Sequence, residues 1–232
     1  MDVQNRENFL DKLAQKMGRA RRLTPDPLPP RLNDYPTTRL TDLSLAQRCQ
    51  EFVDFAKVMA VDVIETKEAD IQQAVLAACE KYGGGKIVLN NDARLEALGI
   101  TSVVRNHYDS YIWDSEKCGE NLARSEQANI GIVYAEYGLA ESGGIVLFSD
   151  KDKGRAVSLL PEKSIVVVRK STVLPRVAQL ASILHKKAQA GERMPSCINI
   201  ISGPSSTADI ELVKVVGVHG PTTKVYIVID DL

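Results

Sequence analysis

The chain has 232 residues, of which 44% are hydrophobic and 25% charged, a composition typical of a globular protein with a sizeable core. At roughly 100 to 200 residues per domain, this length allows one large domain or one domain with an additional arm. Lys and Arg number 29 against 30 Asp and Glu, giving a formal net charge of -1. This balance excludes a global positive field that would attract nucleic acid or anionic lipid.

The sequence carries no signal for a membrane or for export. Its apolar runs are shorter than the about 20 residues that span a bilayer. The N-terminus has Asp2, Arg6 and Glu7 where a secretory signal requires an apolar segment. We therefore expect a cytoplasmic protein. The four cysteines are widely spaced and form no C-x-x-C motif or Cys/His cluster, so the sequence predicts no metal site and no iron–sulfur cofactor in this chain.

The N-terminal part is predicted to be helical. Apolar side chains at helical spacing indicate an amphipathic helix over 5–18 and a longer one over 39–60. Between them, five prolines within 23–36 exclude the interior of a helix or sheet. Since residues 1–60 show almost no strand signal, we interpret them as a helical arm with a proline-rich connector, and 61–232 as the main domain. The apolar stripe of this arm requires a partner surface.

The remaining chain alternates helices with apolar, β-branched strands. Helices are predicted at 67–82, 92–98, 120–129 and 174–189, and strands at 86–89, 111–113, 130–135, 144–149, 156–160, 164–169, 197–201, 213–218 and 224–229. This alternation indicates an α/β fold with a largely parallel sheet, and the strand-rich middle predicts some antiparallel pairs. We expect a three-layer αβα arrangement around a mixed, mostly parallel sheet.

The first candidate for chemistry is the segment 135–144, which lies between two apolar strands. It contains Glu136 and Glu141 followed by Gly143 and Gly144. Two carboxylates beside exposed glycine N–H groups can supply a general base, so the segment offers Glu136 or Glu141 for catalysis and both glycines as binding candidates. The alternative is a plain strand connection, with solvated carboxylates and glycines in turn conformations.

The second candidate is the segment 202–211, which follows a strand and is predicted to open a short helix. Hydroxyls and free backbone N–H groups at a helix N-terminus form a pocket for a small carboxylate or phosphate. The binding candidates are Gly203, Ser205, Ser206 and Thr207, and Asp209 is a catalytic candidate. The alternative is local capping, in which Ser206 accepts from the N–H of residue 209 and Asp209 only complements the helix dipole.

A weaker third candidate is His219, in the turn 217–221 between two predicted strands. A histidine at a strand end can donate a proton into the cleft that the second segment faces. The alternative is an ordinary polar turn residue. G-x-G-x-x-G after a strand, Walker A, H-E-x-x-H and G-x-S-x-G are all absent, so no common nucleotide, zinc or serine-hydrolase motif competes with these segments.

The segments 140–147 and 202–211, followed by 217–221, resemble the LUD-domain family, over essentially the whole chain. The resemblance implies a fold similar to the group of glucosamine-6-phosphate isomerase, ribose-5-phosphate isomerase and CoA-transferase. It also implies a role in oxidising L-lactate to pyruvate with partner proteins that carry iron–sulfur clusters. In the wider fold group an acidic residue and a strand-to-helix loop build the site, which here correspond to Glu141 and the loop 203–209.

The resulting expectation is a subunit of a cytoplasmic lactate-oxidising system that binds a small anionic ligand, acts with iron–sulfur partner proteins and is able to form a homo-oligomer. Two other functions stay open. One is a non-catalytic scaffold or regulatory subunit whose arm docks partners. The other is a stand-alone sugar-phosphate isomerase or acyl-CoA transferase.

Overall fold

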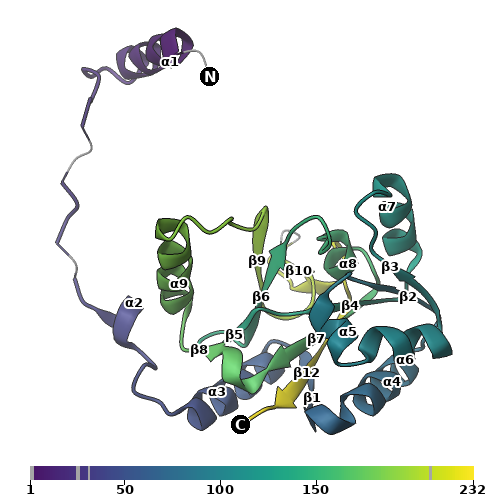
Figure 1. Cartoon of the computed structure of the whole chain (residues 1–232). Helices are drawn as coiled ribbons and strands as arrows, with labels where there is room; N and C mark the ends of the chain where they lie inside the picture. The colour runs from purple at the N-terminus through teal and green to yellow at the C-terminus, as the bar shows by residue number, and fades with distance from the viewer. Residues whose placement is uncertain (1–2, 25–26, 31, 209–210) are drawn as a thin grey trace. The chain divides into compact units, whose positions relative to one another are not determined.

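The structure is a computed structural model that describes residues 3–24, 27–30, 32–208 and 211–232. Its contacts divide the chain into two units, Met1–Asp34 and Tyr35–Leu232. The first unit contains helix α1 (Val3–Lys16), close to the helix predicted over 5–18 (Figure 1). Phe9, Leu13 and Met17 are exposed in this unit. None of the described helices is both long and apolar enough to cross a bilayer.

The second unit is built on a parallel sheet of six strands. The strands are β1 (Val61–Lys67), β2 (Lys86–Leu89), β3 (Asp109–Ile112), β4 (Ile130–Tyr134), β7 (Lys163–Arg169) and β12 (Thr223–Asp230). Their order is β1-β12-β7-β4-β2-β3, and all five pairings are parallel. The central strands are rich in Val and Ile because both of their faces are buried.

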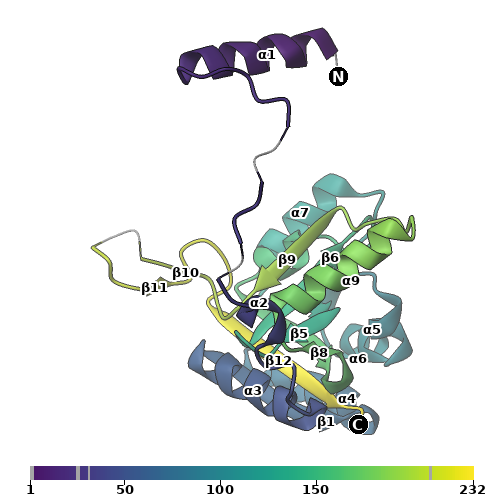
Figure 2. The same cartoon turned by 90° about the vertical axis from the view of Figure 1, so that its left-hand side faces the viewer.

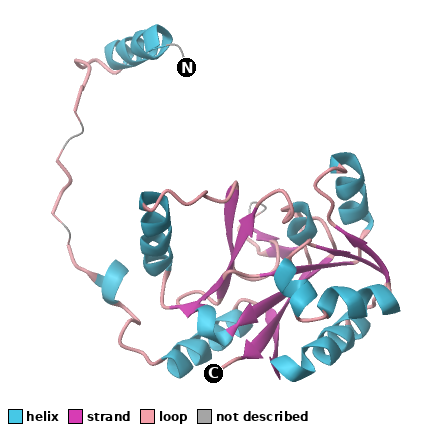
Figure 3. Cartoon of the chain, in the orientation of Figure 1, coloured by secondary structure: helices cyan, strands magenta, loops and turns pink. Residues whose placement is uncertain are grey.

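Helices cover both faces of this sheet (Figure 3). One face packs against α4 (Ile71–Lys81), α5 (Ala93–Ala97) and α6 (Ile100–His107). The other packs against α3 (Leu45–Val58), α7 (Cys118–Gln127), α8 (Ala156–Leu159) and a second sheet. The remaining short elements are α2 (Tyr35–Thr38) and the 3-10 turns η1 (Glu68–Asp70) and η2 (Lys170–Thr172).

The second sheet has the order β8-β5-β6-β9 and contains the antiparallel pairs. Its strands are β5 (Tyr137–Leu139), β6 (Gly144–Ser149), β8 (Val173–Leu174) and β9 (Cys197–Ile201), and α9 (Val177–Gln189) covers its outer face through Leu180. A hairpin of β10 (Ser206–Thr207) and β11 (Val215–Val216) projects from this unit (Figure 2). The α/β class with a mostly parallel central sheet is confirmed, and the antiparallel pairs lie in the second sheet.

Helix α3 belongs to the main domain, which moves the expected boundary. A capping box between Ser44 and Gln47 starts the helix. Its apolar stripe is buried in the core, where the Phe52 ring stacks on Tyr226 of β12 at 5.7 Å between centroids. The division by contacts therefore lies after Asp34, whereas the expected arm extended to residue 60, because the partner surface of this stripe is the domain itself.

One predicted strand is a helix. Residues 156–160 were expected to be extended, but Ala156–Leu159 forms α8. This helix lies directly on β4, where a Cβ added to Gly131 would be 1.9 Å from the Val157 carbonyl oxygen. Glycine at 131 therefore permits a contact that no other residue allows. One strand was missed. No strand was predicted over β1, which follows α3.

Candidate functional site

The carboxyl ends of β2 and β4 form the topological switch point of the parallel sheet. These strands are neighbours, yet the chain leaves β2 toward α5 on one face and leaves β4 toward the second sheet on the other. Connections that diverge in this way open a crevice, which is where open α/β sheets bind ligands. Asn91 and Asp92 follow β2, and Glu136 follows β4, so their side chains line this crevice.

Arg94 joins the two strand ends. Its guanidinium donates to the Glu136 carboxylate at 2.8 and 2.7 Å and to Asp92 at 2.9 and 2.7 Å. The same group lies 4.3 Å from the ring centroid of Tyr134. Burial alone would raise the pKa of Asp92, but the hydrogen bonds from Arg94 outweigh it and hold that pKa below its usual range. Both carboxylates are therefore fixed as ion-pair partners.

The turn after β6 supplies the opposite wall of the crevice. Asp150 accepts from the backbone N–H groups of Asp152 and Lys153, and Lys153 contacts Asp150 at 3.1 Å and Glu136 at 3.5 Å. The main sheet holds this turn in place, because Asn91 donates to the Asp152 carbonyl and the Trp113 indole donates to the Lys151 carbonyl. The turn is thus preorganised from both sides.

The crevice has an inner compartment of ≈ 360 Å³, lined by Asn91, Asp92, Ala93, Arg94, Glu136, Asp150, Asp152 and Lys153. Its carboxylates outnumber its cations, so the compartment is acidic. Asn90, which precedes the lining residue Asn91 in the chain, is only 8% exposed, and its Oδ1 accepts no hydrogen bond from the described residues. A buried acceptor without a donor is a position for a ligand or water proton.

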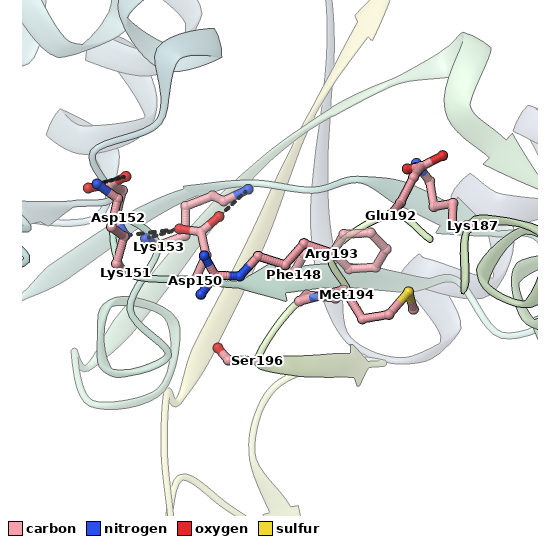
Figure 4. Close-up of a pocket in the computed structure, with 11 residues that line it drawn as sticks. Phe148, Asp150, Lys151, Asp152, Lys153, Lys187, Glu192, Arg193, Met194 and Ser196 are labelled. Carbon is pink, nitrogen blue, oxygen red and sulfur yellow. Dashed lines mark hydrogen bonds and ion pairs between the residues drawn. The ribbon is translucent and has the colours of Figure 1, made fainter. Parts of the chain in front are cut away.

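An outer compartment of ≈ 500 Å³ shares Asp150, Asp152 and Lys153 with the inner one. It lies between the end of β6, the end of α9 and the segment that leads into β9, and its further lining residues are Phe148, Lys151, Lys187, Glu192, Arg193, Met194, Pro195 and Ser196 (Figure 4). Lys187 is paired with Glu192 at 2.7 Å. Arg193 has no hydrogen bond or ion pair with any described residue. The outer compartment therefore carries an excess of positive charge.

Glu141 lies outside this crevice. Its carboxylate accepts from Arg176 Nε and from the backbone N–H of Val177, both at 2.7 Å. Val177 is the first residue of α9, so Glu141 satisfies a free N–H at that helix end. This carboxylate is held in an ion pair at a helix terminus, and a role as acid or base stays a prediction.

The two family-like segments meet each other at the end of α3. Ser202 donates its hydroxyl proton to the Ser142 carbonyl at 2.6 Å. A Cβ on Gly143 would be 2.2 Å from the Ala56 nitrogen, and one on Gly203 would be 2.5 Å from the Met59 carbonyl oxygen. Both glycines have positive φ. Close backbone packing thus accounts for them, while Gly144 begins β6 opposite Leu139.

The helix expected after Pro204 is not present in the described part of this segment. Ser206 and Thr207 form β10 and pair with β11, while Ser205 donates its N–H to the Pro221 carbonyl and accepts from Gly217. The hydroxyl-rich sequence thus enters a hairpin, because Val215 and Val216 offer it a strand partner. Ser206 and Thr207 therefore lie on a strand and not at a helix N-terminus, and anion binding by this segment stays a prediction. Asp209 lies outside the described residues.

His219 is exposed and lines a separate cavity of ≈ 490 Å³ with Asn129, Leu159, Glu162 and Thr222, among others. The structure brings the His219 turn next to Ser205, since a Cβ on the adjacent Gly220 would be 3.3 Å from the Ser205 Cβ. Glu141 does not line that cavity. The catalytic candidates on the described residues, Glu141 and His219, therefore do not share it.

Sequence reasoning missed Arg94, Asp92, Lys153 and Arg193. A usable signal was present: Asp92 and Arg94 follow the predicted strand 86–89, and Glu136 follows the predicted strand 130–135. Parallel strands end at one edge of a sheet. If the two strands had been recognised as neighbours, these charged side chains would have been predicted to lie close together. Arg193 gave no such signal, because it lies in an irregular segment.

The LUD domain profile matches residues 49–229, which cover most of α3, the six-stranded sheet except the last residue of β12, and every described residue of the crevice. The chain belongs to the LUD domain family. In this LUD domain the match begins within α3, in agreement with the burial of that helix in the core.

Relatives of this LUD protein match it from end to end. It is 54% identical over 230 residues to "Uncharacterized protein YkgG" of Escherichia coli K12, covering 99% of this chain and 100% of the relative. It is 40% identical to "Lactate utilization protein C" of Halalkalibacterium halodurans, with 99% of each chain covered. It is 37% identical to the protein of the same name in Bacillus subtilis, covering 99% and 98%.

The fold is shared with a solved structure, the DUF162 family protein from Deinococcus radiodurans. The two chains superpose with a TM-score of 0.60 at 23% identity, over 81% of this chain and 99% of the other.

Within the part of the LUD chain that the structure describes, no three His, Cys, Asp or Glu side chains are grouped so that they could hold a metal ion.

Proposed function

We propose that this chain is a component of a lactate-utilization system and takes part in the oxidation of L-lactate to pyruvate in the cytoplasm. The observation that carries the proposal is the end-to-end match, at 37 to 40% identity, to proteins named lactate utilization protein C. In this role the chain acts with partner proteins that carry the iron–sulfur clusters, since its own cysteines are spaced far apart.

The outer compartment is the proposed place for an organic anion. Arg193 and Lys151 supply charge there, and Arg193 has no carboxylate partner among the described residues. A guanidinium that is free of internal partners can bind a carboxylate or phosphate with two parallel hydrogen bonds. The same property is missing from Arg94, whose donors are used by Asp92 and Glu136.

The ion pairing supports a binding or regulatory role over proton transfer by this chain alone. Glu136 accepts two hydrogen bonds from Arg94, and Glu141 is held by Arg176 and the first N–H of α9. A general base must be free to take a proton from the substrate. A regulatory subunit within the same lactate system is therefore the second candidate function.

The test is growth on L-lactate of the bacterium that encodes the chain, in a strain without other lactate dehydrogenases. Deleting the gene should abolish growth, and the wild-type gene should restore it. R193Q should restore it poorly, whereas K186Q, an exposed change on α9, should behave as wild type. The purified chain alone should not oxidise lactate but should support oxidation when its partners are added. Normal growth of the deletion strain would refute the proposal.

A further inference from the structure

The outer compartment is larger than a three-carbon acid requires. Its volume is ≈ 500 Å³. If every heavy atom takes the ~30 Å³ that a water occupies in the liquid, lactate or pyruvate fills on the order of 200 Å³. A pocket of this size is within the range that holds cofactor-sized ligands. A small acid would leave more than half of the compartment to water, so volume favours a larger occupant.

The compartment is divided into an apolar part and a charged part. Figure 4 shows the Phe148 ring and the Met194 thioether on one side and the Asp150–Lys153 turn on the other. The Arg193 side chain extends from the apolar side in the direction of Asp150. A ligand that fits both parts carries an anionic group at one end and an apolar group at the other.

The apolar part is suited to a flat ring. Phe148 is half-buried, and Tyr137 holds it edge-to-face at 6.3 Å between ring centroids and an interplanar angle of 65°. This contact fixes the ring while leaving part of it to line the compartment. Met194 adds a polarisable sulfur to the lining. Rings and thioethers both make favourable contacts with aromatic groups.

The charged part is suited to a phosphate. Arg193 and Lys151 are both exposed cations at the compartment, and Lys151 has only a loose contact of 3.8 Å with Asp152. Two of the three acidic lining residues are occupied, since Asp150 is bound by Lys153 and its own turn, and Glu192 is bound by Lys187. The third, Asp152, has only its 3.8 Å contact with Lys151, which a phosphate would replace. A phosphate therefore meets two available cations.

We infer that the outer compartment binds a nucleotide-sized aromatic phosphate, with the phosphate on Arg193 and Lys151 and the ring against Phe148 and Met194. This inference deepens the proposed function, because it names the ligand class of the anion site. The acidic inner compartment adjoins it through Asp150, Asp152 and Lys153 and is accessible to the hydroxyl groups of a sugar, for which carboxylates are acceptors.

Titration calorimetry with AMP as the probe tests the inference, with ribose 5-phosphate, inorganic phosphate and L-lactate in parallel. AMP should bind most tightly, and L-lactate and inorganic phosphate at least about tenfold more weakly. R193Q should weaken AMP binding by about tenfold or more, since a charge-assisted hydrogen bond is lost. F148L should weaken AMP but leave ribose 5-phosphate unchanged. K186Q, on the exposed face of α9, is the matched control and should bind AMP as wild type does.

A second measurement uses the wild-type chain and therefore does not depend on whether a pocket variant folds. In the chain labelled with methyl-¹³C methionine, which has four methionines, AMP should shift the Met194 signal and leave that of Met59, near Gly203, unchanged. Equal affinity for AMP and inorganic phosphate, or AMP binding without a shift of Met194, would overturn the inference. Growth of the deletion strain on L-lactate tests the proposed function separately. If the chain bound AMP but the deletion strain grew normally, the lactate role would be refuted and the ligand class of the compartment would be retained.

Discussion

Lys224 lies in the core of the domain, and replacing it should stabilise the protein. It is 2% exposed, between Val61 of β1 and Ser164 of β7, and no described residue pairs with its ammonium group. Burial lowers the pKa of Lys224 from 10.5 to about 8. At ~1.4 kcal/mol per pKa unit, this difference corresponds to about 3 kcal/mol of destabilisation when the lysine is charged in both states.

The sign of the pH dependence follows from proton counting. Below about pH 8 the lysine is protonated in the folded and the unfolded chain, and the full cost is present. Between about 8 and 10.5 the unfolded chain binds more protons, so the contribution of Lys224 to stability rises with pH. K224M keeps the aliphatic packing and removes the charge. We expect K224M to be more stable than wild type by about 3 kcal/mol at pH 7 and by about 1 kcal/mol at pH 10.

The measurement is urea unfolding of both proteins at several pH values. Only the difference between them is interpreted, because burial also raises the pKa of Cys49, Cys79 and Tyr226, which destabilises the folded state at high pH in both proteins. K186M, on the exposed face of α9, is the control and should show no pH-dependent difference. If K224M were less stable than wild type at pH 7, or its gain did not shrink with pH, the reasoning would be refuted.

Three further predictions concern the segments that surround the site. G143A should lower the free energy of unfolding by about 3 kcal/mol, because its Cβ would collide with the backbone of α3. The control G191A, where φ is also positive but the space is open, should lower it by about 1 kcal/mol in the same thermal or chemical unfolding experiment. Equal losses would contradict the packing role of Gly143. E141A should cost about 2 kcal/mol by removing the acceptor of the first N–H of α9, against less than about 0.5 for E120A in an exposed ion pair. D92N should lower the free energy of unfolding by about 2 kcal/mol at pH 7. The difference between D92N and wild type should shrink as the pH falls below about 4, because the stabilisation that goes with the lowered Asp92 pKa is lost when that carboxyl is protonated. A difference that is the same at pH 3 as at pH 7 would show that it does not come from the Asp92 charge.

Three strands were predicted to the residue. β6 and β9 match the predicted ranges 144–149 and 197–201, and β2 matches 86–89, because short apolar runs between turn residues leave little ambiguity. This signal does not require burial on both faces, since no residue of β9 is fully buried. The short run 156–160 carried the same apolar signal, but Ala156–Leu159 forms a helix, because a run of five residues is too short to distinguish the helical period from the strand period. Tertiary contact with Gly131 decides the outcome there.

The site was harder to predict than the fold. The glutamate-glycine segment was recognised as a candidate site, but its Gly143 permits the close approach of α3, a contact between positions about ninety residues apart in the chain. Glu136 was noticed as one of two carboxylates, yet its partner Arg94 becomes visible only when β2 and β4 are known to be neighbours. Composition and spacing report on local structure, whereas strand order sets which charges meet.

The position of β12 has a consequence for how the chain is made. Among the described strands Thr223–Asp230 is synthesised last, yet it lies between β1 and β7 and is the sheet partner of β1. The first strand therefore waits, without its neighbour, until about 160 further residues have been synthesised. Shortening the C-terminus by one strand would leave β1 and the Phe52 ring of α3 uncovered, so premature termination should yield an aggregating product rather than a smaller folded one.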